Sequence, residues 1–315
     1  MKSKVSKTNL LNIIGCSMLG MIFSVQNLKA QEDVITFDIG YSGGSISVLS
    51  EGQGKGNSNL LIGATEEMIK RAIPDGSYPI ATNAFMVEMG DKVWLFDAGY
   101  GQKTIDNLAL YGKKASDIDA VFITHFHGDH IGSLLINNQK GYPNATLYVS
   151  KPEYDYYMND AAMSALPENR RGSFTTARNI FNVYKDKLVV FTPGEIENGT
   201  ELIPGVRGVA AYGHTPGHVG YMIESGSDKL FFWGDLTHAM AIQMPYPEVA
   251  MTYDTDPVKA VEVRQKLLKY LLENKIPVAG AHIEFPGMGD LIKVGPVGYE
   301  FVLRCSCGGR MPDVQ

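Results

Sequence analysis

The segment His125-Phe-His-Gly-Asp-His130 places three imidazoles and a carboxylate within six residues. It follows the apolar run Ala120–Ile123, which is typical of a buried strand. A strand that ends at Thr124 would bring His125 and His127 to a loop at the edge of a sheet, and would turn Asp129 and His130 toward a second point nearby. Neutral imidazole and carboxylate are ligands that suit zinc and other first-row transition metals. The segment therefore predicts metal binding, and its two groups of ligands favour two ions.

Three further apolar strands end in candidate ligands. The predicted strands over 206–211, 230–233 and 278–281 are followed by His214, Asp235 and His282, respectively. A rigid sheet can hold such side chains while they converge on one point. Taken alone, each of these residues is explained by a polar turn or a helix cap. Their recurrence beside the first segment favours one shared metal site.

The rest of the chain after residue 30 alternates strands with helices, which favours a layered α/β fold in a single domain over residues 31–315. The clearest helix is predicted over 257–274, with Asp256 as its N-cap and Pro257 at its first position. The polar, glycine-rich stretch Gly52–Asn59 predicts a surface loop.

The N-terminus has the pattern of a secretory signal peptide over residues 1–30. Lys2, Lys4 and Lys7 precede an apolar stretch that ends near a small residue, Ala30. The stretch is shorter than the ~20 residues that a membrane span needs. We therefore expect a periplasmic or secreted protein without stable membrane association after cleavage. A lipid anchor on Cys16 is the alternative.

Composition narrows the classes of partner. Apolar residues make up 44% of the chain, charged residues 20%, and the formal net charge is −6, with no run of basic residues. This balance gives no reason to expect nucleic acid or an anionic membrane surface as a partner. The two cysteines that follow the signal peptide, Cys305 and Cys307, are too close in sequence for an unstrained disulfide and are interpreted as incidental.

Four motifs, in this order, resemble the ligand motifs of the metallo-β-lactamase-fold hydrolases. They are Thr124-His-Phe-His-Gly-Asp-His130, Gly213-His-Thr-Pro-Gly-His218, Gly234-Asp235 and Ala281-His282. Leu95-Phe-Asp-Ala-Gly99 also resembles the first motif of that superfamily. The resemblance implies an α/β fold of the αββα four-layer sandwich type, with a dinuclear metal site along one edge.

The resemblance also implies which residues bind the metals. It implies two sets of ligands that share one carboxylate: His125, His127 and His214 for one ion, Asp129, His130 and His282 for the other, and Asp235 as the bridge. His214 is assigned rather than His218 because the family uses the first histidine of this motif, so His218 is expected to support the site from behind. Asp97 resembles the family's non-ligand aspartate and is expected to orient the site.

Several positions at which branches of the superfamily differ from one another narrow the range of expected activities. Asp235 stands where one well-known class of β-lactamases has cysteine, which disfavours antibiotic hydrolysis. His127 stands where flavodiiron-type oxygen reductases have an acidic residue, which disfavours redox chemistry. The segments Gly234–His238 and Ala281–Gly289 look most like the branch that holds methyl parathion hydrolase and related secreted lactonases. N-acyl-homoserine lactonases have tyrosine at the position of His238.

The expected activity is that of an exported dinuclear zinc hydrolase that cleaves lactone or ester bonds in a small molecule through a hydroxide between the metals. Mn²⁺, Co²⁺ or Fe²⁺ in place of zinc is left open, as is a homodimer. Asp129 is expected to pass a proton to the leaving group, and His238 either donates to the substrate oxygen or is only structural. A phosphotriesterase is the second reading, and an exported metal-binding protein without turnover is the third.

Two segments, Tyr154–Phe181 and Leu60–Ile73, carry aromatic and aliphatic residues that either wall a substrate pocket or belong to the core. Core packing is the more common outcome for such residues, and we expect it for most of them.

Overall fold

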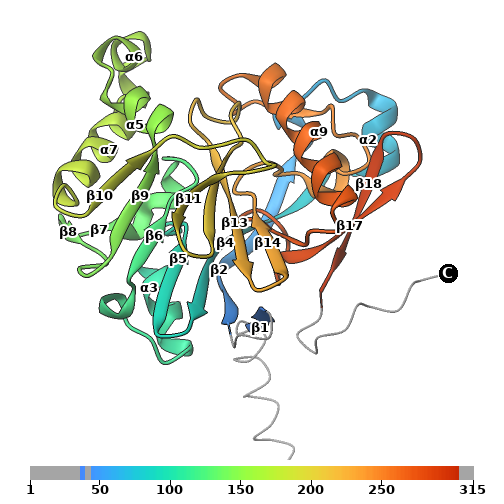
Figure 1. The fold of residues 1–315 in the computed structure, drawn as a ribbon. Coiled ribbons are helices and arrows are strands. Elements are labelled where there is room, and N and C mark those ends of the chain that lie inside the picture. Colours follow the sequence, from blue (N-terminus) through green and yellow to red (C-terminus); the bar gives the residue numbers. More distant parts are fainter. Residues whose placement is uncertain (1–35, 40–43, 305–315) are drawn as a thin grey trace, which may run out of the picture.

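A computed structural model describes residues 36–39 and 44–304 of the chain. Within this part, the strands form two sheets of seven strands each, which face one another, and helices cover the outer faces (Figure 1). This is the αββα sandwich that the sequence predicts. The predicted signal peptide over 1–30, Cys16, Cys305 and Cys307 lie outside the described residues. Among the described residues, no helix has the length and apolar composition that a bilayer crossing requires.

The first sheet is built from the N-terminal half of the described chain. Its order is β1 (Thr36–Ile39), β2 (Gly44–Asn57), β4 (Ser77–Met89), β5 (Lys92–Phe96), β6 (Ala120–Phe122), β9 (Thr146–Ser150) and β10 (Leu188–Phe191). Strands β5, β6, β9 and β10 run parallel to one another, so their carboxyl ends meet at the same edge of the sheet.

The second sheet is built from the C-terminal half. Its order is β11 (Thr200–Ile203), β12 (Val206–Ala210), β13 (Val219–Ser225), β14 (Asp228–Phe232), β16 (Val278–Ala279), β17 (Met288–Val294) and β18 (Gly298–Leu303). Strands β12 and β14 are both antiparallel to β13, and β14 is parallel to β16. The carboxyl ends of β12, β14 and β16 therefore also share one edge.

The helices and the shorter elements connect these strands. The helices are α2 (Glu66–Ala72), α3 (Gln102–Leu110), α4 (Gly128–Ile131), α5 (Lys151–Met158), α6 (Asp160–Ala165), α7 (Gly172–Val183), α8 (Met240–Gln243) and α9 (Pro257–Glu273). Two small antiparallel sheets pair β3 (Leu61–Ile62) with β15 (Ala250–Met251), which is distant in sequence, and β7 (Leu135–Ile136) with β8 (Gln139–Lys140) in a hairpin. Short 3₁₀ turns occur at Ser58–Leu60, Ala115–Asp117, Gly132–Leu134 and Glu168–Arg170.

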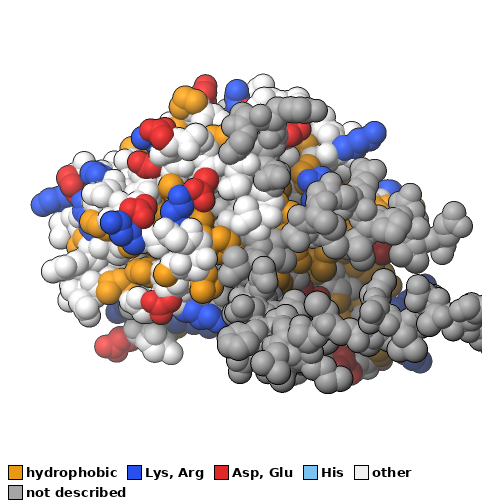
Figure 2. All heavy atoms as spheres, turned by 90° about the horizontal axis from the view of Figure 1, so that it is seen from below, with side chains coloured by type: hydrophobic (Ala, Val, Ile, Leu, Met, Phe, Trp, Pro, Cys, Tyr) orange, Lys and Arg blue, Asp and Glu red, His pale blue; other side chains and the backbone are white. Residues whose placement is uncertain are grey.

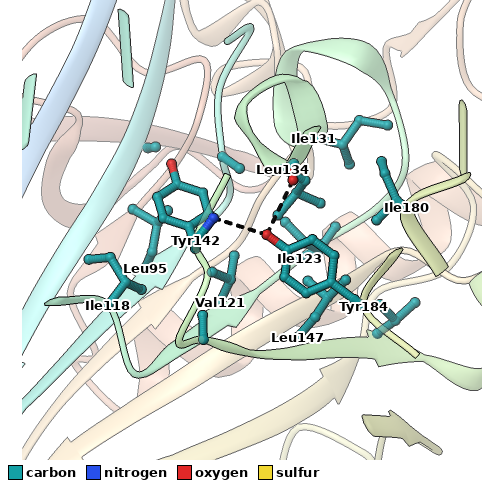
Figure 3. Packing of buried hydrophobic residues seen from close by; sticks show 14 of the residues in the cluster. Leu95, Ile118, Val121, Ile123, Ile131, Leu134, Tyr142, Leu147, Ile180 and Tyr184 are labelled. Carbon is teal, nitrogen blue, oxygen red and sulfur yellow. Dashed lines mark hydrogen bonds between the residues drawn. The ribbon is translucent and has the colours of Figure 1, made fainter. Parts of the chain in front are cut away.

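Three apolar layers hold the sandwich together. The central layer lies between the two sheets and includes stacked or edge-on rings from both, such as Phe96, Phe122 and Tyr221. An outer layer packs α5 and α7 on the first sheet, and another packs α9 on the second. In the first outer layer, Tyr184 is surrounded by aliphatic side chains, and its hydroxyl accepts from the Tyr142 amide and donates to the Leu134 carbonyl (Figure 3). This polar group is buried but fully bonded, as buried hydroxyls usually are.

Two sequence predictions of local structure have opposite outcomes. Helix α9 begins at Pro257 and ends at Glu273, and the Asp256 side chain caps it by accepting from the Lys259 amide, as predicted. The predicted loop at Gly52–Asn59 is wrong, because residues 52–57 continue strand β2 and pair with the start of β4 beyond a bulge. The backbone hydrogen bonds of this ribbon do not depend on apolar side chains, so polarity alone was a poor guide to a loop.

The two sheets are joined by hydrogen bonds at the edge where their strands end. The Val219 amide donates to the Thr124 carbonyl, the Tyr221 hydroxyl to the Ile123 carbonyl, and the Asn83 amide to the Ala281 carbonyl. These bonds link the first sheet to the second beside the predicted ligands. They fix how far apart the ligands of the two halves lie.

Candidate metal centre

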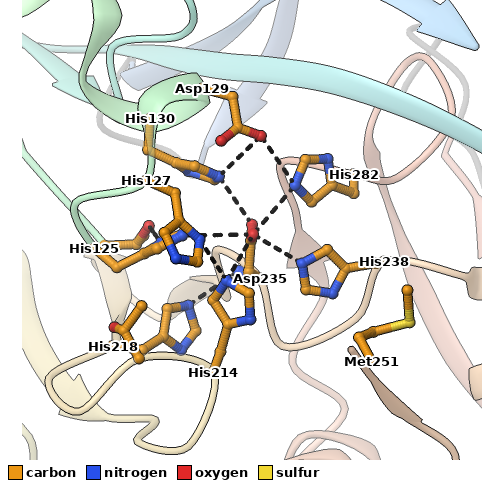
Figure 4. A network of polar contacts seen from close by, with 12 residues as sticks. His125, His127, Asp129, His130, His214, His218, Asp235, His238, Met251 and His282 are labelled. Carbon is orange, nitrogen blue, oxygen red and sulfur yellow. Dashed lines mark hydrogen bonds and ion pairs between the residues drawn. The ribbon is translucent and has the colours of Figure 1, made fainter. Parts of the chain in front are cut away.

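The predicted ligands converge between the carboxyl ends of strands from both sheets (Figure 4). We call His125, His127, His214 and Asp235 the first cluster, and Asp129, His130 and His282 the second cluster. Within each cluster, one potential ligand atom per residue lies within 4.8 Å of every other. Asp235 also contacts the second cluster, with its carboxylate 3.1 Å from His130 Nε2 and 3.2 Å from His282 Nε2. The structure thus brings together every residue of the predicted ligand set.

The first segment contributes to both clusters because a helix begins within it. His127 precedes α4 as its N-cap residue, and Asp129 and His130 lie in the first turn. In Figure 4, all four side chains of this segment point toward Asp235, with Asp129 and His130 above His125 and His127 in the view. A backbone hydrogen bond from the Ala98 amide to the His130 carbonyl anchors this helix to the loop after β5.

Asp97 orients two of the imidazoles, as expected. Its backbone has a φ of 58°, which turns the buried carboxylate toward the ligand segment. It lies 2.7 Å from His130 Nδ1 and accepts from the amide and hydroxyl of Thr124. The Thr124 hydroxyl in turn lies 3.0 Å from His125 Nδ1. Both imidazoles are therefore held with Nε2 facing the clusters.

Asp254 does the same for His214, and the sequence reasoning missed it. One carboxylate oxygen lies 2.9 Å from His214 Nδ1, and the other accepts from the Met251 amide at 2.8 Å. Asp254 lies in a polar turn just before α9, where an aspartate is usually explained as a cap, so no local pattern marks it. Only the folded chain brings it to His214, 40 residues away.

His282 is oriented by the first sheet although it follows a strand of the second. Its Nδ1 donates to the Ala81 carbonyl at 2.8 Å, and Asn83 donates to the Ile283 carbonyl. Both Ala81 and Asn83 belong to β4. His282 Nε2 then lies 3.5 Å from the Asp129 carboxylate in the second cluster.

His218 is buried beside the clusters but does not point into them. Its Nδ1 donates to the Ala211 carbonyl at 2.8 Å, and its Nε2 accepts from the Asp235 amide at 3.0 Å. Burial lowers the pKa of His218 to about 3, so the ring is neutral, as its acceptor role requires. The choice of His214 over His218 therefore agrees with the geometry.

His238 contacts Asp235 directly. Its Nε2 lies 2.9 Å from an Asp235 carboxylate oxygen, and its ring stacks on His282 with centroids 4.9 Å apart. Burial lowers the pKa of His238 to about 4, so a neutral ring donates through Nε2. Its Nδ1 has no hydrogen-bond partner among the described residues. The contact with Asp235 favours a role in holding the carboxylate, and donation to a substrate oxygen stays a prediction.

The charges in the centre favour the binding of cations. Burial raises the pKa of Asp235, but the surrounding imidazoles, His130 foremost, outweigh this and hold the pKa well below its usual range. Burial and neighbouring imidazoles hold the pKa of His125 well below its usual range. Despite burial, the neighbouring carboxylates raise the pKa of His130 and His282 above its usual value and that of His214 to about 9. Cations would therefore bind to this centre in exchange for protons on these imidazoles.

The distances in the clusters fit divalent cations. Two ligand atoms that are each 2.0–2.1 Å from a tetrahedral zinc are themselves ~3.3 Å apart. In the first cluster, His127 Nδ1 lies 3.0 Å from His214 Nε2, and His125 Nε2 lies 3.6 Å from Asp235. Among the described residues, three buried ligand atoms have no hydrogen-bond partner, namely His125 Nε2, His130 Nε2 and Asp235 Oδ1. Cations bound in the clusters would satisfy all three.

The aromatic residues of Tyr154–Phe181 pack mainly in the core, as expected for most of them. Tyr157, Phe174 and Phe181 are buried in the core of the first sheet, so the core explanation holds for them. Two tyrosines that the sequence reasoning did not single out interact with residues of the centre. The Tyr253 ring is 5.2 Å from the His238 ring and 40% exposed, and Tyr100 is 65% exposed, with burial and the Asp129 charge raising its pKa.

Among curated proteins, the chain is similar to enzymes that act on RNA. It is 26% identical to the endoribonuclease YSH1 of Candida albicans over 216 residues. This matched region covers 62% of this chain and 25% of that protein. It is 29% identical over 125 residues to ribonuclease Z of Listeria monocytogenes, which covers 36% of this chain and 38% of that protein. The chain thus spans about a quarter to two fifths of these relatives. The prediction that nucleic acid is not a partner stays a prediction.

Among solved structures, the similarity extends over nearly the whole length of the matched chains. The hydrolase AbOPH, described as a member of the beta lactamase superfamily, has a TM-score of 0.75 and 26% identity, with 85% of this chain and 96% of that chain covered. The dizinc quorum-quenching lactonase AidC, in complex with a product, has the same TM-score and identity, with 86% and 97% covered.

The family model described as "Metallo-beta-lactamase superfamily" matches residues 77–282, which include both clusters, Asp97 and Asp254. The match covers more than half of the chain and agrees with the αββα sandwich. The chain belongs to the metallo-beta-lactamase superfamily.

Proposed function

We propose that this protein is an exported dinuclear metallohydrolase that cleaves lactone or ester bonds in small molecules. The observation that carries the proposal is the position of Asp235, whose carboxylate contacts imidazoles of both clusters. One anion between two sets of ligands offsets the repulsion between two cations. The likeness to a dizinc lactonase supports zinc as the metal and a lactone as the substrate.

The seven predicted ligands would hold the two ions, with His125, His127 and His214 on one, Asp129, His130 and His282 on the other, and Asp235 between them. When bound, such a pair of ions lowers the pKa of a water molecule toward neutrality and polarises the oxygen of the bond that is cleaved.

The residues of the chain have separate tasks in this reaction. The contacts of Asp129 with His130 and His282 both involve Oδ2, which leaves Oδ1 to carry a proton to the leaving alkoxide. The side chain of Asp129 is 19% exposed, so a bound substrate can reach it. Asp97 and Asp254 fix which imidazole nitrogens face the ions, and His238 holds the Asp235 carboxylate. Tyr253, beside His238, and Tyr100, near Asp129, are exposed rings that a bound substrate would contact.

Export is part of the proposal and rests on the sequence of residues 1–30 alone. On the uncovered part of the face in Figure 2, acidic and basic side chains are interspersed rather than gathered by sign.

A panel of substrates tests the proposed activity. It comprises N-acyl-homoserine lactones, aryl esters, a phosphotriester and an RNA substrate, the last because the curated relatives are ribonucleases. We expect a kcat/KM above about 10⁴ M⁻¹ s⁻¹ on the best lactone or ester, which is ordinary for an enzyme on its own substrate. The activity should disappear with a chelator and return with zinc.

Two results would contradict the proposal. The first is turnover of RNA or of the phosphotriester well above that of every lactone and ester. The second is lactone hydrolysis that persists in the Asp235→Asn protein after chelation.

A further inference from the structure

Glu153 is a carboxylate buried behind the first cluster that the proposed reaction does not use. It lies in the first turn of α5 and is 1% exposed. Helix α5 follows strand β9 of the first sheet, and Ser150 caps its first turn by accepting from the Glu153 amide. A carboxylate this deeply buried is rare unless its partners satisfy it.

Both carboxylate oxygens of Glu153 are bonded, each to a different ligand loop. Oε1 accepts from the Phe126 amide at 2.9 Å. Oε2 accepts from the Thr215 hydroxyl at 2.7 Å and from the Gly217 amide at 2.9 Å. Phe126 lies in the loop after β6 of the first sheet, and Thr215 and Gly217 lie in the loop after β12 of the second. One side chain therefore ties together loops that belong to different sheets.

The bonded groups lie next to the imidazoles of the first cluster. Phe126 is between His125 and His127, and Thr215 directly follows His214. These are the three imidazoles of the first cluster. A shift of the Glu153 carboxylate would therefore change the separation of His127 and His214, whose facing nitrogens lie 3.0 Å apart.

Other contacts of α5 strengthen the same link. The Tyr157 hydroxyl donates to the Phe126 carbonyl, and the Ser150 hydroxyl donates to the Gly217 carbonyl. A Cβ atom on Gly217 would lie 2.0 Å from the Glu153 backbone nitrogen, so only glycine lets this loop lie against α5. Helix α5 thus holds both loops by their backbones.

The partners of Glu153 donate hydrogen bonds but carry no charge. They are two amides and a hydroxyl. Burial raises the pKa of Glu153, and these hydrogen bonds, together with the nearby His214, lower it only in part. Three donors that all point to the carboxylate fit an acceptor-only, ionised group. Cations in the first cluster would further favour that ionised form.

We propose that Glu153 is a positioning residue that holds the three imidazoles of the first cluster at metal-binding distance by joining their two loops. This inference rests on the proposed metal binding, and it concerns a residue that touches neither metal nor substrate. If α5 were an ordinary core helix, the loss of one of its contacts would lower the stability of the protein without changing the metal site. If Glu153 is a positioning residue, the loss of its contacts changes the metal site as well.

The test compares Glu153→Gln with Asp155→Asn in the full-length protein. Asp155 is two residues further along the same helix, and it is exposed and paired with Lys151, so its variant is a matched control. Each protein is stripped of metal and titrated with Co²⁺, whose visible absorption reports the geometry of its ligands. Thermal unfolding of the metal-free proteins is measured in parallel, and amide hydrogen exchange of Phe126 and Gly217 reports the loops directly.

An amide in place of the carboxylate presents N–H groups to one of the two loops, so one set of bonds is lost. We expect Glu153→Gln to bind Co²⁺ about 10–100-fold more weakly than the parent, as for other residues that orient ligands. Its cobalt absorption should shift and the two amides should exchange faster, whereas Asp155→Asn should match the parent. Thr215→Val removes one of the three donors and should show a smaller change in cobalt affinity and absorption in the same direction. If Glu153→Gln does not fold, this variant tests the positioning role in its place.

The opposing results are separable. A Glu153→Gln protein that unfolds at a lower temperature but has the parent's cobalt spectrum and affinity would show that Glu153 is only structural. A folded parent protein that takes up no Co²⁺ would overturn the metal proposal and this inference with it.

Discussion

The two halves of the molecule supply ligands in different ways. In the N-terminal half, all four predicted ligands come from one continuous segment, His125–His130. In the C-terminal half, His214, Asp235 and His282 each follow a different strand, β12, β14 and β16. The first arrangement needs only a strand end and one turn of helix, whereas the second needs the whole sheet.

This difference shows where the precision of the centre comes from. The first half helps to orient ligands of the second, since the Ala81 carbonyl accepts from His282 and the Glu153 carboxylate accepts from the loop of His214. Asp235 is the point at which the two halves meet, because its carboxylate contacts imidazoles from both. Substitutions that disturb both halves should therefore impair metal binding and hydrolysis more than substitutions that disturb only one half.

Asp235→Asn should have the largest effect, because it removes the charge that both clusters share. We expect lactone or ester hydrolysis to fall by more than the ~10²–10³-fold that is typical of losing one oxyanion donor. The fold should survive, since the Asp235 amide keeps its bond to His218. Steady-state rates and circular dichroism of the same preparation check this. Near-parental turnover would show that the two halves do not depend on a shared carboxylate.

His214→Ala and His218→Ala should distinguish the predicted metal ligand, His214, from the residue expected to support the site, His218, within one loop. His214→Ala should lose the metal of the first cluster. His218→Ala should retain it but lower the free energy of unfolding by about 1–3 kcal/mol, because the buried Ala211 carbonyl and Asp235 amide lose their partner. Metal content by elemental analysis and unfolding by denaturant check both. Equal metal loss from the two variants would contradict the assignment.

Asp97→Asn and Asp254→Asn compare the orienting carboxylates of the two halves. Each should weaken metal binding by about 10–100-fold, the usual cost of losing such a partner. Asp97→Asn should have the larger effect, because Asp97 also accepts from the Thr124 amide and hydroxyl. Competition with a chelating dye measures the affinities. Asp256→Asn is the matched control for Asp254, since asparagine also caps a helix.

His238→Tyr and His238→Ala should have the smallest effects of this series. His238 contacts Asp235 but belongs to neither cluster as defined here, so His238→Ala should lower every activity by no more than about 10–100-fold. A phenol is longer than an imidazole and can donate to a carbonyl oxygen. His238→Tyr should therefore shift the ratio of lactone to phosphotriester turnover toward lactone. Unchanged rates in both variants would leave His238 as a structural residue only.

The same contrast explains what the sequence could predict. The segment His125–His130 carries its geometry locally, so its residue types and spacing are informative on their own. His214, Asp235 and His282 could be predicted because each follows an apolar strand and matches a motif of the resembled family. Asp254 and Glu153 could not, because their partners are distant in sequence and their neighbours are ordinary cap or helix residues.

The layered fold was also predictable, because strand and helix patterns alternate along the chain. The error at Gly52–Asn59 arose because the extension of β2 is held by backbone pairing with β4, which leaves no apolar alternation to detect. Core aromatics such as Phe174 and Phe181 could not be separated from pocket walls by composition alone. Their burial depends on how α7 packs against the first sheet.

The central claim is that two divalent ions are held between the two halves, and metal stoichiometry tests it most directly. The purified protein, reconstituted with zinc and freed of excess metal, should contain about two ions per chain, as a site of two bridged metals requires. The Asp235→Asn protein should contain clearly fewer under the same conditions. A parent protein that is folded and holds one ion or none after reconstitution would contradict the account.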